Sequence, residues 1–187
     1  MPRGYLRMSE ATLTRQAPAA DDPNHCVDPV TLAKLTETAA LDAGVTHEDM
    51  VRRQAGLARR EQIGAANLKR VAAAGIPIAL GTDAGNPLTL HGPSVYAELE
   101  AMQAAGLTPP QVLVSATRDS ARALGREKDL GTVEKGKQAD LLILGADPAA
   151  DIKNVRQVRY VMRGGALRSI AELSALATTP PQTEEAE

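Results

Sequence analysis

The chain has 187 residues, a formal net charge of −2 at pH 7 and 43% hydrophobic residues, with three tyrosines and neither phenylalanine nor tryptophan. The near-balanced charge gives no electrostatic reason to expect binding to nucleic acid or to an acidic membrane surface. The length allows one domain with a hydrophobic core. It is too short for a full (β/α)8 barrel, which needs roughly 250 residues.

The cysteine content and the hydropathy pattern indicate the cellular compartment. Cys26 is the only cysteine, so the chain cannot form an internal disulfide, which is compatible with a reducing cytoplasm. The sequence opens with no signal-like segment and contains no apolar run long enough to span a bilayer. We therefore expect a cytoplasmic protein that acts without a membrane.

The N-terminal part predicts an irregular leader followed by two helices. Residues 1–29 contain four prolines and should lack regular structure. Residues 30–42 carry a broad apolar face, typical of a helix that ends near Gly44. A longer helix should start at Thr46, with Asp49 completing a capping box, and end near Gly75. Two internal glycines, Gly56 and Gly64, favour a bend or break in it.

A short apolar run then predicts a buried strand that ends at a carboxylate. Residues 76–80 lack polar alternation, as in strands covered on both faces of a parallel sheet. Gly81 and Gly85 flank Thr82 and Asp83 and tolerate tight turns. Asp83 would therefore lie at the carboxyl edge of a strand, where α/β folds bind ligands. The alternative is that Asp83 only caps the turn.

The rest of the chain changes from helical to β character. Helices are expected over residues 95–105, from the capping residue Thr108 onward, and over residues 119–124. Strands are expected over residues 131–134, 139–144 and 157–163, with turns at residues 135–136 and 164–165. Residues 169–176 favour a final helix, and residues 178–187 favour disorder.

A series of short segments between residues 74 and 165 occurs in a family-specific order. They are residues 74–85, His91-Gly92, Glu98-Leu99 with Met102, residues 105–109, Ala116-Thr117, Leu124-Gly125, residues 131–137, residues 139–141 and Gly164-Gly165. Together they resemble the C-terminal portion of a metal-dependent amidohydrolase, nearest the imidazolonepropionase-like and Xaa-Pro dipeptidase-like branch.

The resemblance implies an α/β fold, namely a partial amidohydrolase-type (β/α) barrel followed by a small β segment of a composite β-sandwich. It divides the chain into four parts: a leader (1–29), a remnant of the TIM barrel (30–125), sandwich-like strands (126–168), and a short helix with an acidic tail (169–187). It also implies a divalent metal, zinc, and a small-molecule substrate. Asp83 matches the family aspartate that follows strand eight, binds the catalytic metal and handles the proton of the attacking water.

The other metal ligands of the family have no counterpart in this sequence. The resembling family carries a His-x-His pair on its first barrel strand. This chain has three histidines, His25, His47 and His91, and no two of them are close enough in the sequence to form such a pair. A catalytic zinc needs about three protein ligands and an open position. If the chain is active, the missing ligands must come from these histidines or from another subunit.

Several neighbouring residues have both a functional and a structural interpretation. His91 could act as an acid or contact substrate, or it could be an exposed loop residue. Thr82 and Asn86 could orient Asp83 or substrate, or satisfy the turn backbone. His47 with its two acidic neighbours is better explained as the first turn of a helix, and His25 with Cys26 supplies only two ligands.

Three functional hypotheses follow. The first is a metal-dependent hydrolase of amide-type C–N bonds in small molecules such as dipeptides or cyclic amides. The second is a non-catalytic, truncated amidohydrolase. The third is a metal-independent esterase that uses Ser94 or His91. Strands without neighbours make self-association through exposed edges plausible.

Overall fold

The structure is a computed structural model that describes residues 3–40, 44–85 and 88–178. Three helices come first: α1 (Arg3–Thr14), α2 (Pro29–Ala40) and α3 (His47–Ala73). The middle part contains α4 (Pro93–Ala104), α5 (Pro109–Val114), the π-helical turn η1 (Ser115–Asp119) and α6 (Ser120–Ala123). The last part contains β1 (Leu141–Leu144), the 3₁₀ helix η2 (Ile152–Arg156), β2 (Val158–Arg163), β3 (Ala166–Ser169) and α7 (Ile170–Thr178).

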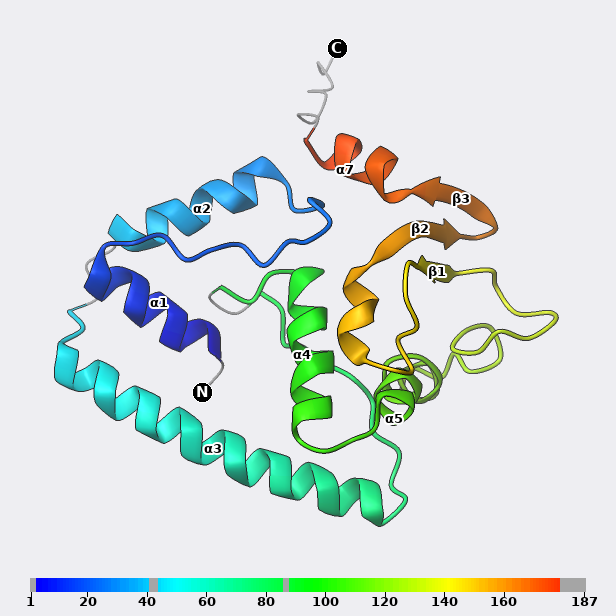
Figure 1. Cartoon of the computed structure of the whole chain (residues 1–187), viewed down its shortest axis with the longest axis horizontal. Coiled ribbons are helices and arrows are strands. Elements are labelled where there is room, and N and C mark those ends of the chain that lie inside the picture. The colour runs from blue at the N-terminus through cyan, green and yellow to red at the C-terminus, as the bar shows by residue number, and fades with distance from the viewer. Residues whose placement is uncertain (1–2, 41–43, 86–87, 179–187) are drawn as a thin grey trace.

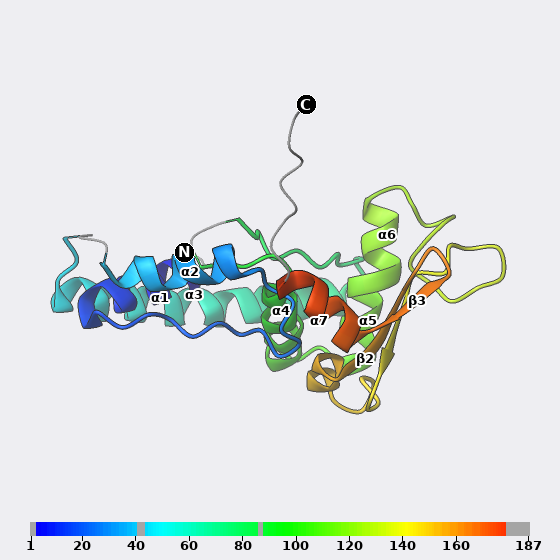
Figure 2. The same ribbon diagram turned by 90° about the horizontal axis from the view of Figure 1, so that it is seen from above.

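The helices and strands lie in two groups, one on each side of α4 (Figure 1). Figure 1 shows α1, α2 and α3 on one side and the small sheet on the other, with α4 between them. Figure 2 gives the same arrangement from above, with α7 also near the middle. None of the described helices is both long enough and apolar enough to cross a bilayer.

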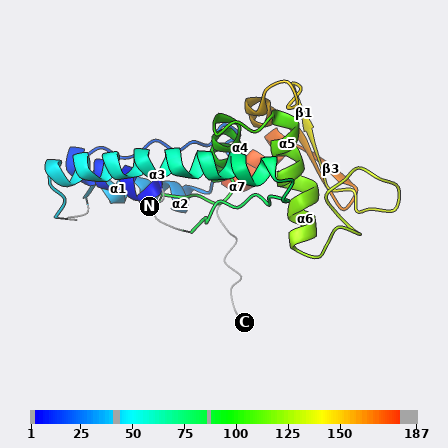
Figure 3. The ribbon, with the colours of Figure 1, turned by 90° about the horizontal axis from the view of Figure 1, so that it is seen from below.

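The long helix α3 confirms its predicted start and extends without interruption. The Thr46 hydroxyl accepts a hydrogen bond from the Asp49 N–H, and the Asp49 carboxylate accepts one from the Thr46 N–H, both at 3.1 Å. The expected break at Gly56 and Gly64 is wrong, because the helix runs for 27 residues along the long dimension of the molecule (Figure 3). Glycine in a helix costs conformational entropy but removes no backbone hydrogen bond.

The prediction of an entirely irregular leader is also wrong, because α1 occupies residues 3–14. This helix packs against both α2 and α3. Its Ser9, Ala11 and Thr12 are buried, and the Ser9 hydroxyl accepts a hydrogen bond from Arg53 Nη1 at 2.6 Å. Packing of α1 against α2 and α3 therefore stabilises a helix that was not predicted, because the prediction rested on the proline content of residues 1–29.

The predicted strand over residues 76–80 is not a strand, because it pairs with no other strand in the described chain. The segment instead runs beside the α5–η1 region, where the Leu80 N–H donates to the Ser120 hydroxyl (3.1 Å) and to the Ser115 carbonyl (3.4 Å). Ile78 and Leu80 contact the core, whereas Ile76 is 55% exposed. A strand needs a neighbour to satisfy its backbone groups, and local sequence cannot supply one.

The C-terminal sheet is antiparallel with strand order β1-β2-β3. It confirms two predicted strands, and Gly164 and Gly165 form the predicted turn with φ of 55° and 83°. The strand expected over residues 131–134 is wrong. That region is a turn-rich loop, in which Lys137 Nζ donates to the Thr132 hydroxyl and, at 2.7 Å, to the Glu127 carbonyl. The short strand β3 was not predicted.

The remaining predicted helices are present. The structure has α2, α4, α5, α6 and α7 where helices were expected, and the Thr108–Gln111 capping box starts α5. The main core lies between α4, α5 and η2; its buried members are Leu99, Met102, Leu107, Val112, Ile152 and Val155. Because Leu80 packs against this core, the core fixes where the chain enters the loop that carries Asp83.

Candidate functional site

The loop between residues 81 and 92 folds back on itself after Asp83. Asp83 has a left-handed backbone, with φ of 53°, and an exposed side chain. The Gly85 N–H donates to the Thr89 carbonyl at 3.1 Å, and Gly85 itself has φ of 101°. Aspartate tolerates the left-handed region better than most residues, and glycine tolerates it best. The sequence thus builds a tight turn that presents the Asp83 carboxylate to solvent.

The same turn brings His91 near Gly85. The Nε2 atom of His91 lies 3.9 Å from the position that a Cβ atom on Gly85 would take, so the imidazole lies near Gly85. Gly85 is two residues from Asp83, which places both predicted catalytic side chains on one loop. The side chain of His91 is exposed. This position suits contact with a bound molecule as well as a simple surface role.

A cavity of about 900 Å³ lies beside this loop. Its walls come from α1, α3, α4 and the loop, and include Arg7, Arg60, Thr82, Leu88, Leu90 and Met102. Thr82, one of the predicted substrate-binding residues, lies on the cavity wall, whereas the lining does not include Asp83 or His91. Asn86, the other predicted substrate-binding residue, lies outside the described residues. Sequence reasoning missed the cavity because its walls come from helices distant along the chain.

The described residues do not assemble a complete metal centre. Across residues 3–40, 44–85 and 88–178, no three side chains of His, Cys, Asp or Glu gather closely enough to hold a metal ion. Asp83 therefore belongs to no group of three such side chains in the described part of the chain. A catalytic zinc requires about three protein ligands.

The two other histidines lie outside this loop. The backbone carbonyl of His25 accepts a hydrogen bond from the Ser174 hydroxyl at 2.9 Å, and His47 is the first residue of α3, as its acidic neighbours predicted. Partial burial and the charge of Asp22 raise the pKa of the Cys26 thiol. Since the thiolate is the form that binds metals, this shift further weakens the case for a site at His25 and Cys26.

Ser94, the candidate esterase nucleophile, lies in the first turn of α4. Its hydroxyl donates to the Leu90 carbonyl at 2.6 Å. A serine nucleophile needs a base within hydrogen-bonding distance of its hydroxyl, and this hydroxyl is directed to the backbone. The geometry therefore gives Ser94 a structural role at the helix start.

Comparison with known proteins gives partial matches to enzymes named as a deaminase and as an imidazolonepropionase. The chain is 33% identical over 129 residues to a 5-methylthioadenosine/S-adenosylhomocysteine deaminase of Moorella thermoacetica, covering 64% of the chain and 28% of that protein. It is 43% identical over 84 residues to an imidazolonepropionase of Aromatoleum aromaticum, covering 44% of the chain and 20% of that protein. The matched stretches thus span less than a third of these relatives.

Solved structures give the same partial likeness. A Xaa-Pro dipeptidase with methionine bound in its active site matches with a TM-score of 0.50 at 29% identity, over 56% of this chain and 25% of that one. A phenylurea hydrolase B matches with a TM-score of 0.50 at 30% identity, over 62% of this chain and 29% of that one. The sequence model of the amidohydrolase family matches residues 9–168, and the chain therefore belongs to the amidohydrolase family.

Proposed function

We propose that the chain acts in the hydrolysis of amide-type C–N bonds in small molecules such as dipeptides or cyclic amides. The observation that carries this proposal is the position of Asp83, at the end of a segment anchored to the core and within the stretch that matches the amidohydrolase family. The relatives named imidazolonepropionase and deaminase, and the structure named as a Xaa-Pro dipeptidase, support C–N chemistry on small molecules.

Asp83 would be one ligand of a divalent metal, with zinc as the proposed ion, and would accept the proton of the attacking water. Its exposed carboxylate is a hard anionic oxygen ligand suited to that role. A bound zinc would lower the pKa of a coordinated water towards neutrality. Because the described residues hold no three-ligand group, the other ligands would come from a second copy of the chain.

The neighbours of Asp83 would bind and orient the substrate. His91, whose imidazole lies near Gly85 on the same loop, would donate a proton to a leaving group held over the loop. Thr82 borders the cavity and could bind substrate there through its hydroxyl. Asn86 is assigned the same role on the basis of sequence alone.

A second candidate is a non-catalytic chain that keeps the family fold elements without a working site. The lack of a three-ligand group among the described residues favours this candidate. Such a chain would fold but would turn over no substrate with or without metal.

Hydrolysis assays on the purified chain separate these possibilities. Dipeptides, lactams and simple esters would be tested with chelator and with added zinc, using the unmodified chain, Asp83→Asn and Ser94→Ala. Glu127→Gln is the matched control, since it makes the same carboxylate-to-amide change at another exposed position. Zinc-stimulated turnover that is lost only in Asp83→Asn supports the proposal.

The other outcomes identify the alternatives. Turnover that resists chelator and is lost in Ser94→Ala would replace the proposal with an esterase. A folded chain without turnover under any condition would assign the non-catalytic function.

A further inference from the structure

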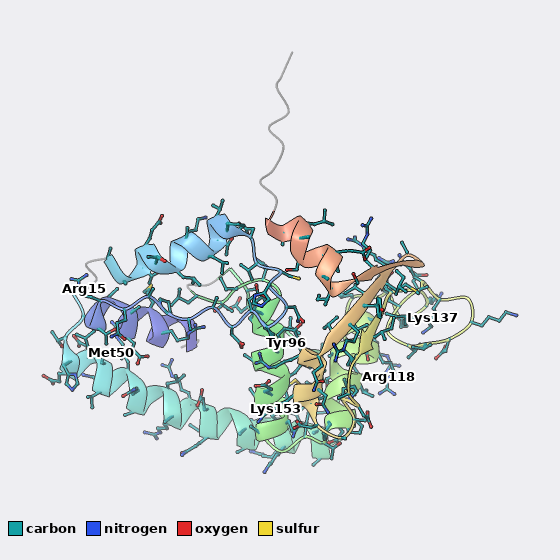
Figure 4. The ribbon with its side chains drawn as sticks, turned by 45° about the horizontal axis from the view of Figure 1, so that its top comes forward. Arg15, Met50, Tyr96, Arg118, Lys137 and Lys153 are labelled. Atoms are coloured by element: carbon teal, nitrogen blue, oxygen red, sulfur yellow. The ribbon has the colours of Figure 1, made fainter. Side chains whose placement is uncertain are left out.

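Arg156, the last residue of η2, joins three parts of the chain. Its Nη1 and Nη2 atoms donate to the two carboxylate oxygens of Asp21 at 2.7 and 3.0 Å, and its Nε donates to Glu100 on α4 at 2.6 Å. The guanidinium also lies over the ring of Tyr96, 5.1 Å from the centroid. Figure 4 shows Tyr96 on α4, between the N-terminal helices and the sheet. The Arg156 side chain therefore makes ion pairs, planar hydrogen bonds and a cation–π contact at the same time.

Residues 21–27, which we name the strap, are attached mainly by polar contacts. Asn24 Nδ2 donates to the Tyr96 hydroxyl at 2.6 Å, and the His25 carbonyl accepts from Ser174 on α7 at 2.9 Å. Val27 is the only strap residue that is buried. The Asp22 carboxylate accepts from the N–H groups of Cys26 and Val27, which shapes the strap internally. A segment with so little buried apolar area can detach without unfolding the core.

One residue of the strap, Asp21, also lines the cavity beside the Asp83 loop. Asp21 lines that cavity together with Arg7, while Thr82 and Leu88 belong to the loop that forms another part of its wall. We propose that Arg156 acts as an ionic latch, which holds the strap against α4 and so closes one wall of this cavity. This inference does not depend on the proposed hydrolysis, because it concerns only the access of molecules to the cavity.

The geometry explains why an arginine is needed. Arg156 uses Nε for Glu100 and both terminal nitrogens for Asp21, a division that a lysine ammonium cannot reproduce with the same planarity. The charged groups around Asp21 are Arg156 from η2, Arg7 from α1 and Glu100 from α4. The Asp21 side chain is 50% exposed, so salt should weaken its pairing.

Hydrogen exchange measured by mass spectrometry tests the latch directly. Asp21→Asn removes the strap carboxylate but leaves the Arg156–Glu100 pair intact. Arg156→Lys keeps the positive charge but removes the planar guanidinium that bonds both carboxylates. Glu134→Gln is the control, because it breaks a different ion pair, that of the exposed Glu134 carboxylate with Lys137. Both strap variants should accelerate exchange in residues 21–27 by about tenfold, with unchanged exchange in α4 and the sheet.

Access to the cavity is the second readout. A dye that fluoresces on apolar surfaces should bind more strongly to Asp21→Asn than to the unmodified chain or to Glu134→Gln, and added salt should raise dye binding to the unmodified chain. Unchanged strap exchange in both variants would overturn the proposal. Equal acceleration throughout the chain would also overturn it, since the ion pairs would then stabilise the whole fold instead of one strap.

Discussion

At the residue scale, Asp83 and Arg156 differ in how far sequence can reveal them. The pattern of a short apolar run followed by glycines identified Asp83, because all of its determinants are local. The partners of Arg156 lie up to 135 positions away in the sequence, and a local sequence pattern cannot predict contacts between residues so far apart. The exposure of Asp83 and the absence of a ligand group around it likewise depend on which segments meet in space.

The pairing of Asp21 should make stability depend on pH. Hydrogen bonds from Arg156, helped by the charges of Arg156 and Arg7, lower the pKa of Asp21 against an opposing effect of burial. A carboxyl group with a lowered folded-state pKa stabilises the fold above its unfolded pKa, and this contribution disappears as the pH falls through the folded value. The unfolded value is about 3.9.

Urea unfolding of the unmodified chain and of Asp21→Asn at several pH values measures this effect. The unmodified chain should be more stable by about 0.5 kcal/mol near pH 7, a small value because the pair is half exposed. The difference should shrink towards zero as the pH falls below about 4. A difference that stays constant down to strongly acidic pH would show that Asp21 contributes through packing and not through charge.

At the element scale, helices were predicted better than strands because their hydrogen bonds are internal. The caps at Thr46 and Thr108 lie where the sequence indicated, and each helix satisfies its own backbone. Residues 76–80 have the composition of a strand but lack a partner strand among the described residues, so they form no ladder. Strand β3 was missed because its four residues have little β character, and pairing with β2 through the glycine turn determines it.

The capping box of α3 should contribute measurably to stability. Thr46→Ala removes the acceptor for the Asp49 N–H and should lower the free energy of unfolding by about 1 kcal/mol. Thr36→Ala, at an exposed position within α2, is the matched control and should change stability by less than about 0.5 kcal/mol. Thermal or urea unfolding followed by circular dichroism measures both. Equal effects of the two changes would refute the role of the cap.

At the scale of the whole molecule, the chain exposes more surface than a compact monomer of its mass. Its accessible surface is 12318 Å², whereas a compact monomer of this mass exposes about 8,600 Å². The exposed large apolar side chains on the sheet are Leu142, Ile143, Tyr160 and Leu167. In the described chain, β1 and β3 are the edge strands and each pairs only with β2. Both features favour association with further polypeptide.

Self-association should therefore be detectable in solution. Sedimentation of the purified chain should give an average mass above 19.6 kDa that rises with concentration. Leu142→Lys and Leu167→Lys place a charge on each edge strand and should shift the distribution towards the monomer. A chain that sediments as a monomer at all concentrations would contradict this expectation.

The measurement that tests the central claim most directly is zinc-dependent hydrolysis by the unmodified chain and by Asp83→Asn. Asparagine tolerates the left-handed backbone of residue 83, so the variant should fold normally. We predict that turnover requires zinc and falls by about a hundredfold or more in Asp83→Asn, with Glu127→Gln unaffected. Turnover that is equal in Asp83→Asn and the unmodified chain, or no turnover from a folded sample with zinc, would contradict the assignment of Asp83 to a hydrolytic site.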